Sequence, residues 1–170
     1  MKSLNRLISD YTDLLKRGEL QLAYKGILDF LGKLRADFIK KYPWYDVSGI
    51  YQGYMDMSYF ALSNEHFKKK GLKIAVVYLH DKGAFEVWLS ARNREISKSL
   101  EPLVNGVIVD GLMVFHDETN LDAVIECSLS SAPDFDNQAA LICEIEQGVE
   151  SFVGAVERVV TSKPITLIGG

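Results

Sequence analysis

Two stretches of the sequence carry the side chains best suited to bind a ligand: residues 51–60, YQGYMDMSYF, and residues 72–92, LKIAVVYLHDKGAFEVWLSAR. Side chains alternate between the two faces of a strand, so the even positions after Tyr51 place hydrogen-bonding groups on one side. If this strand neighbours the second stretch, that side joins a polar face of the second stretch in a concave, polar-aromatic patch. The candidate ligand-binding residues are then Tyr54, Asp56, Tyr78, Glu86, Trp88 and Arg92.

The carboxylates in these stretches also allow a second chemistry. Asp56 or Asp81 together with Glu86 could hold a divalent metal for hydrolysis, provided that they converge to within about 2.0 to 2.6 Å of one ion. We expect instead that Arg92, tyrosine hydroxyls and water hold Asp56 and Glu86 without a metal. No cofactor is expected and no catalytic residue is assigned.

Other motifs favour turns over catalysis. His80-Asp81 and His116-Asp117 stand at predicted strand ends, where turn residues are common. The sequence contains no G-x-S-x-G nucleophile motif. Cys127 and Cys143 lack the spacing of metal ligands and are expected to be buried free thiols.

The charge of the chain limits its partners. The formal net charge is −4, so the protein as a whole does not attract phosphate, and the cluster Lys68, Lys69, Lys70 and Lys73 is typical of a solvated loop. Nucleic acid is therefore not the expected partner. We expect a small ligand, a peptide or another protein, including a second copy of the chain as a homodimer. No apolar run reaches membrane-spanning length and residues 1–18 are amphipathic, so neither a membrane nor a secretory route is expected, and the predicted location is cytoplasmic.

Helices are predicted at both ends of the chain. Apolar residues recur at helical spacing from Leu4 to Leu15, and Gly18 is suited to end that helix. A second apolar stripe runs from Leu20 to Phe38, so the two segments are expected to form a helical hairpin. A long helix is predicted over residues 136–160, with Asp134 or Asp136 as its N-cap.

A sheet is expected between these helices. Two strands flank Asp81-Lys82-Gly83, which suits a three-residue hairpin loop. This loop would pair Leu79 with Phe85, Val77 with Val87 and Ala75 with Leu89 on the core face. The opposite face would then carry Tyr78, Glu86 and a partly exposed Trp88. Asn93 is expected to cap a short helix, and two further strands are expected at about residues 107–116 and 122–130.

The order of these elements predicts an α+β fold. We expect a single domain over residues 1–170, in which a mainly antiparallel central sheet packs against the N-terminal helical hairpin and the long C-terminal helix. The chain contains neither a linker-like stretch nor an internal repeat.

The strings YPWYDVSGIYQGYMDMSYF and LKIAVVYLHDKGAFEVWLSARNREI resemble a small bacterial family of domains of unknown function. This resemblance covers roughly residues 20 to 100 of the chain and implies no activity. A weaker resemblance, to the restriction-endonuclease-like fold, implies metal-binding acids and a lysine two residues after the second acid. Asp81 and Glu86 could be those acids, but Trp88 replaces the lysine, which favours an inactive relative. The expected function is therefore a binding module, and the alternative is a metal-dependent hydrolase or an inactive relative of such nucleases.

Overall fold

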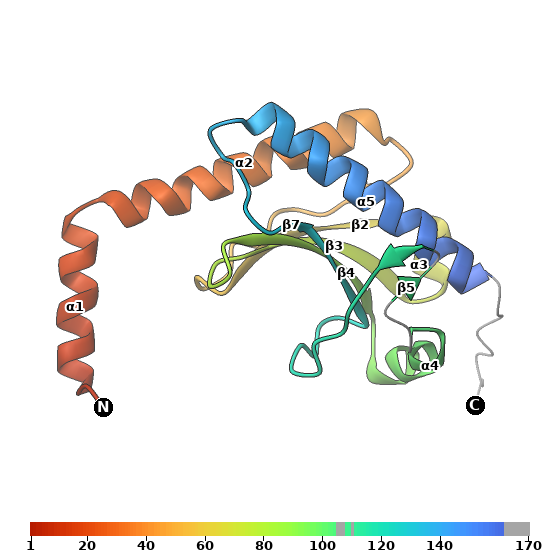
Figure 1. The fold of residues 1–170 in the computed structure, drawn as a ribbon, viewed down its shortest axis with the longest axis horizontal. Helices are drawn as coiled ribbons and strands as arrows, with labels where there is room; N and C mark the ends of the chain where they lie inside the picture. The colour runs from red at the N-terminus through yellow and green to blue at the C-terminus, as the bar shows by residue number, and fades with distance from the viewer. Residues whose placement is uncertain (105–107, 110, 162–170) are drawn as a thin grey trace.

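The computed structural model describes residues 1–104, 108–109 and 111–161. A curved, antiparallel sheet forms its centre, and helices α2 and α5 cover one face of this sheet (Figure 1). The predicted α+β fold, with a helical pair at the N-terminus and a long helix at the C-terminus, is confirmed.

Five helices occur in the described part of the chain: α1 (Leu4–Lys16), α2 (Glu19–Lys41), α3 (Glu65–Lys69), α4 (Arg94–Val104) and α5 (Gln138–Thr161). Asn93 caps α4 as predicted, because its side-chain oxygen accepts the Ile96 amide at 2.9 Å. The predicted aspartate cap of α5 is wrong. Asn137 is the cap residue, and the Asp134 carboxylate accepts the Asp136 amide in the preceding turn.

The main sheet has the strand order β1-β2-β3-β4-β7, and a small separate pair is formed by β5 and β6. The strands are β1 (Asp46–Val47), β2 (Met57–Ser63), β3 (Leu72–Leu79), β4 (Ala84–Ala91), β5 (Ile108–Val109), β6 (Leu112–Met113) and β7 (Ile125–Ser130). All pairs in the main sheet are antiparallel, as predicted.

The main core lies between the sheet and the two helices that cover it. The predicted burial of Phe85, Val87 and Leu89 is confirmed. Opposite them, α2 contributes Phe30, Leu31, Leu34 and Phe38, and α5 contributes Leu141, Ile145, Val149, Phe152, Val153 and Val156. The thiols differ: Cys127 is buried in this core, whereas Cys143 is exposed on α5.

The register of the β3–β4 hairpin differs from the predicted one by one residue. Leu79 pairs with Ala84, so the loop has four residues, and Gly83 ends it with φ +59°. Tyr78 consequently faces the main core beside Phe85, and Ala75 pairs with Trp88 on the opposite face. The prediction failed because β3 is apolar on both faces, so alternation alone does not distinguish them.

The tyrosine-rich stretch is a bent hairpin and not one continuous strand. Residues 46–51 run back along β2, with Asp46 opposite Ser63 and Tyr51 opposite Tyr59. The turn between them contains two residues with left-handed backbones, Gly53 at φ +74° and Met55 at φ +65°. The alternation predicted from Tyr51 onward is therefore broken before β2 begins.

Helix α1 projects from the body of the molecule (Figure 1). It precedes α2, to which Arg17 and Gly18 connect it as an open hairpin, and Gly18 takes the left-handed backbone at φ +76°. None of the residues of α1 is buried.

We predict that Gly53→Ala destabilises the protein much more than Gly83→Ala. A Cβ at Gly53 would lie 1.9 Å from the Met57 carbonyl oxygen, whereas one at Gly83 meets no atom within 4 Å. Gly83→Ala should therefore cost only the left-handed backbone strain, about 1–2 kcal/mol, and Gly53→Ala should lose more because the turn must open. Urea unfolding of both variants measures the difference, and equal midpoints would contradict the close approach in this turn.

Candidate ligand site on the open face of the sheet

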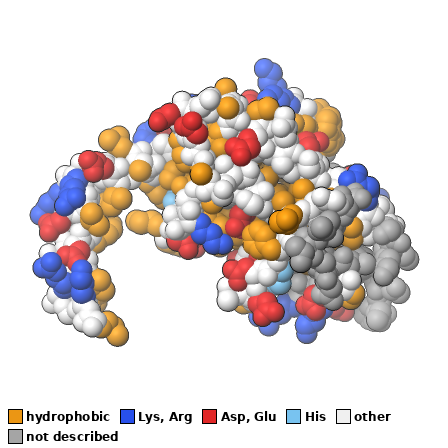
Figure 2. All heavy atoms as spheres, in the orientation of Figure 1, with side chains coloured by type: hydrophobic (Ala, Val, Ile, Leu, Met, Phe, Trp, Pro, Cys, Tyr) orange, Lys and Arg blue, Asp and Glu red, His pale blue; other side chains and the backbone are white. Residues whose placement is uncertain are grey.

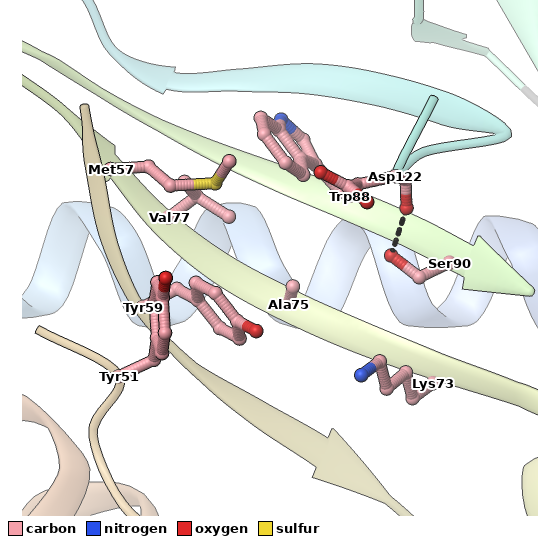
Figure 3. Close-up of a pocket in the computed structure, with 9 residues that line it drawn as sticks. All are labelled: Tyr51, Met57, Tyr59, Lys73, Ala75, Val77, Trp88, Ser90 and Asp122. Atoms are coloured by element: carbon pink, nitrogen blue, oxygen red, sulfur yellow. Dashed lines mark hydrogen bonds between the residues drawn. The ribbon is translucent and has the colours of Figure 1, made fainter. Parts of the chain in front are cut away.

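A pocket of about 350 Å³ lies on the open face of the sheet, the side away from α2 and α5 (Figure 3). Its walls combine aromatic, apolar and charged side chains from β2, β3, β4, the segment before β2 and the loop before β7. The lining residues are Tyr51, Met57, Tyr59, Lys73, Ala75, Val77, Trp88, Ser90 and Asp122.

The floor of this pocket is apolar because the β3–β4 register brings three side chains together. Ala75 pairs with Trp88 across the strands, and Val77 lies two residues along β3 on the same face. With Ala123 these residues form a second apolar cluster, separate from the main core, against which Met57 and Tyr59 pack. The floor is therefore apolar and formed mostly by regular strands.

Two tyrosine rings form one wall. Tyr51 and Tyr59 are directly opposite each other, and their ring centroids are 5.0 Å apart. Tyr59 is half-buried and Tyr51 is 44% exposed. Figure 3 shows the Tyr59 hydroxyl directed across the floor toward Ala75. This wall presents an aromatic surface to the pocket.

A cationic end adjoins the aromatic wall. The exposed Lys73 side chain extends from β3 into the pocket (Figure 3), and no carboxylate within the described part of the chain forms an ion pair with it. A neighbouring groove of about 740 Å³ shares Tyr51, Tyr59 and Lys73 and continues to Arg92 and Lys68. Lys68 is paired with Asp46. Lys73 and Arg92 therefore make this end of the open face positively charged.

Only two of the six predicted site residues reach this surface. Trp88 lines the pocket and Arg92 lines the adjoining groove. Trp88 is only 4% exposed, so its predicted partial exposure is wrong, although α5 lies on the other face and does not cover it. Its indole nitrogen donates to the Glu86 carboxylate at 2.8 Å.

Tyr78 and Glu86 stabilise the fold and do not line the pocket. Tyr78 packs in the main core, with its ring centroid 4.9 Å from that of Phe85, and burial raises the pKa of its phenol. Glu86 does share the face of Trp88 but is buried, and its other carboxylate oxygen lies 3.4 Å from the Lys82 ammonium. Trp88 and Lys82 therefore take the role predicted for Arg92.

Tyr54 and Asp56 lie in the turn before β2, away from the pocket floor. Tyr54 is 90% exposed, and its amide donates to the Asp56 carboxylate at 2.9 Å. Hydrogen bonds from the amides of Met57 and Tyr54 lower the pKa of Asp56. Asp56 is thus a turn residue, and the prediction that it meets Glu86 on a shared face is wrong because the turn separates them.

The carboxylates do not form a hydrolytic centre in the described part of the chain. No group of three His, Cys, Asp or Glu residues there is arranged to hold a metal ion. The buried Glu126 accepts hydrogen bonds from the Asp117 amide at 3.3 Å and the Asn120 side chain at 3.0 Å, and His116 lies 3.1 Å away. Burial raises the pKa of Glu126 despite these partners. These contacts hold the loop before β7 against the sheet.

A histidine that sequence reasoning assigned to a turn joins three segments of the chain. The Ser58 hydroxyl donates to the Gln52 carbonyl at 2.5 Å, so the His80 Nε2, 2.8 Å away, must donate to the Ser58 oxygen. The Tyr24 ring stacks on His80, with centroids 5.3 Å apart. This geometry does not activate Ser58 as a nucleophile, because His80 holds its proton on the nitrogen facing it.

The sequence carried one signal that could have identified the site. Lys73 has the same parity as Ala75 and Val77 along β3, and a charged residue marks the more accessible face of a strand. Lys73 therefore indicates that the face of β3 carrying Ala75 and Val77 is the open one.

Comparison with known proteins identifies the family of this chain. A family model described as a domain of unknown function, DUF7000, matches residues 4–160. The chain belongs to the DUF7000 family. The matched region includes the whole open-face pocket, so the pocket is part of the DUF7000 domain.

The remaining comparisons add no relative. Neither the curated proteins nor the solved structures contain a match. The expected likeness to the restriction-endonuclease-like fold is not shown. Among the described residues, no helix combines the length and the apolar character needed to cross a membrane.

We predict that the protein loses stability as the pH falls below about 6.5, and that His80 contributes to this loss. Burial lowers the pKa of His80 below its ordinary 6.5, although Asp56 and Asp81 partly oppose the shift. The unfolded chain then binds the proton first, so protonation favours unfolding. His80→Gln retains a donor for Ser58 but does not titrate. The melting temperature of this variant should therefore fall less steeply between about pH 7.5 and pH 5.5 than that of the wild-type protein. Identical slopes would contradict the role of His80.

Proposed function

We propose that this DUF7000 domain binds a small organic anion with a flat, apolar body on the open face of its sheet. The observation that carries the proposal is the Lys73 ammonium, which forms no ion pair with a described carboxylate, beside an apolar floor and a tyrosine wall. A site of this kind combines burial of a hydrophobic ligand body with one polar group that fixes its orientation. We also retain the expectation that the protein acts in the cytoplasm.

The dimensions of the open face suit a small molecule. Ligand pockets commonly measure about 300 to 1,000 Å³, and the pocket of about 350 Å³ adjoins the larger groove toward Arg92. The flat body would lie over Ala75 and Val77 beside the Tyr59 ring, because aromatic side chains contribute large contact areas with little loss of conformational freedom.

The charges of the lining side chains orient the ligand. Asp122 is the one carboxylate that lines the pocket in the described part of the chain, and it lies beside Ser90, whose hydroxyl donates to the Asp122 backbone carbonyl at 2.7 Å. Repulsion from Asp122 directs an anionic group away from the β4–β7 side. Lys73 and, along the groove, Arg92 attract the anion instead. The metal-dependent hydrolase receives no support from the carboxylate geometry.

We expect the fluorescent anion anilinonaphthalene sulfonate to bind at this pocket. Lys73→Ala should weaken binding about tenfold or more, since a hydrogen bond to a charged group contributes about 1.5–3 kcal/mol. The matched control is Lys69→Ala, which removes an exposed lysine outside the pocket lining. Ala75→Trp should abolish binding by filling the floor. Titrations followed by fluorescence and calorimetry measure these dissociation constants.

A neutral compound of the same shape separates charge recognition from adhesion to apolar surface. Phenylnaphthylamine lacks the sulfonate, so it should bind the wild-type protein more weakly and should not distinguish Lys73→Ala from Lys69→Ala. Sulfonate binding that is unchanged by both Lys73→Ala and Ala75→Trp would refute the proposed site.

A further inference from the structure

Helix α1 carries an apolar stripe with no partner within the described part of the chain. Its large apolar side chains are between 45% and 70% exposed, and they recur at helical spacing: Leu4, Leu7, Ile8, Tyr11 and Leu14. Figure 2 shows hydrophobic side chains along the side of this arm that faces the body of the molecule, with charged side chains along the outer side. The arm and the body therefore enclose a notch with an apolar wall.

This helix lacks the contacts that normally stabilise so short an element. It has 13 residues, none of them buried. Isolated helices shorter than about 12–15 residues are marginal in water, and most helices in proteins depend on the packing of one amphipathic face. The α1 helix thus needs a covering surface that its own chain does not supply in the described structure.

The base of the notch is a preformed apolar groove. A cavity of about 330 Å³ lies where α1 meets α2, lined mainly by Tyr11, Leu15, Leu20, Ala23, Tyr24, Ile27 and Met55. It is continuous with the stripe through Tyr11. An amphipathic helix with apolar anchors about one turn apart is the shape that such a groove accepts, and α1 is itself a helix of this kind.

Both acidic side chains of the arm are paired with cations of the arm itself. Asp10 pairs with Lys2 at 2.7 Å and with Arg6 at 3.1 Å, and Lys16 pairs with Asp13 at 3.4 Å. These charged side chains lie outside the stripe, so the occupant of the notch must match an apolar surface. A second α1 presents that surface and can pack on the stripe without burying a charged side chain.

The exposed area agrees with a missing contact. A standard interface covers about 800 Å² on each partner. The stripe residues, each at least 45% exposed, and the adjoining groove are the apolar surface that the arm and its base offer to such an interface.

We infer that the occupant of the notch is a second copy of this chain, whose α1 lies antiparallel to the first. Such a contact is isologous: the arm of each copy enters the notch of the other, so one interface buries both stripes and both grooves. Gly18, with its left-handed backbone, forms the elbow that holds each arm away from its own α2.

Light scattering after gel filtration and sedimentation equilibrium test this inference on the full chain. The wild-type protein should have twice the mass of 19.1 kDa and dissociate only on extensive dilution. Leu7→Glu places a charge on the stripe and should give a monomer with less helical circular dichroism, because the released arm unwinds. Ser9→Glu, on the outer face of α1, is the matched control and should remain a dimer. Near-ultraviolet circular dichroism checks that the body of each variant is folded, since α1 contributes no buried residue.

Cross-linking gives an independent measurement that does not require dissociation. In a Cys143→Ser background the buried Cys127 is the remaining thiol. Ile8→Cys should then form a cross-linked dimer with a short bismaleimide, and Ser9→Cys should not. A wild-type monomer at all concentrations, or a dimer that persists in Leu7→Glu, would overturn the inference. So would a monomer that cosediments through α1 with phosphatidylcholine–phosphatidylglycerol vesicles, which would assign the stripe to a lipid surface.

Discussion

The pairing of Leu79 with Ala84 sets the arrangement of every other layer in this molecule. It places Phe85, Val87 and Leu89 on the face that α2 and α5 cover, and it places Trp88 on the opposite face. Because side chains alternate along a strand, a slip of one residue would move Trp88 and Glu86 into the helical core and expose Phe85. The four-residue loop that ends at Gly83 holds this register, and the Trp88–Glu86 hydrogen bond satisfies the polar groups that the register buries on the open face.

The two faces of the sheet consequently differ in chemistry. One is a continuous apolar core in which α2 and α5 meet β2, β3, β4 and β7. The other has a small apolar floor bordered by tyrosine rings and by the charged ends of Lys73, Asp122 and Arg92. An antiparallel sheet tolerates this asymmetry because only one face needs to be covered by helices. The proposed anion site uses the uncovered face, where a curved sheet provides a concave and rigid support.

The turn before β2 connects this face with the arm. Tyr51 and Met57, on either side of the turn, line the open-face pocket, whereas Met55 at its tip and the neighbouring His80 line the groove at the base of α1. Tyr24 of α2 holds the same turn, because its hydroxyl donates to the Gln52 carbonyl at 2.9 Å and its ring stacks on His80. The proposed ligand site and the proposed dimer contact thus share one short segment, in which Gly53 packs closely against the Met57 carbonyl.

The sequence by itself determined the elements whose signals are local. Apolar spacing predicted the two terminal helical regions, Asn93 predicted the start of α4, and the Gly83 turn predicted the β3–β4 hairpin. Only the tertiary structure decided the register, because both faces of β3 are buried. One face carries Ile74, Val76 and Tyr78, and the other carries Ala75 and Val77. The tertiary structure also decided that the left-handed Gly53 and Met55 divide the tyrosine-rich stretch into two antiparallel segments. The candidate pocket depends on both of these facts, since Tyr51, Tyr59, Lys73 and Trp88 meet only through the pairing of successive antiparallel segments.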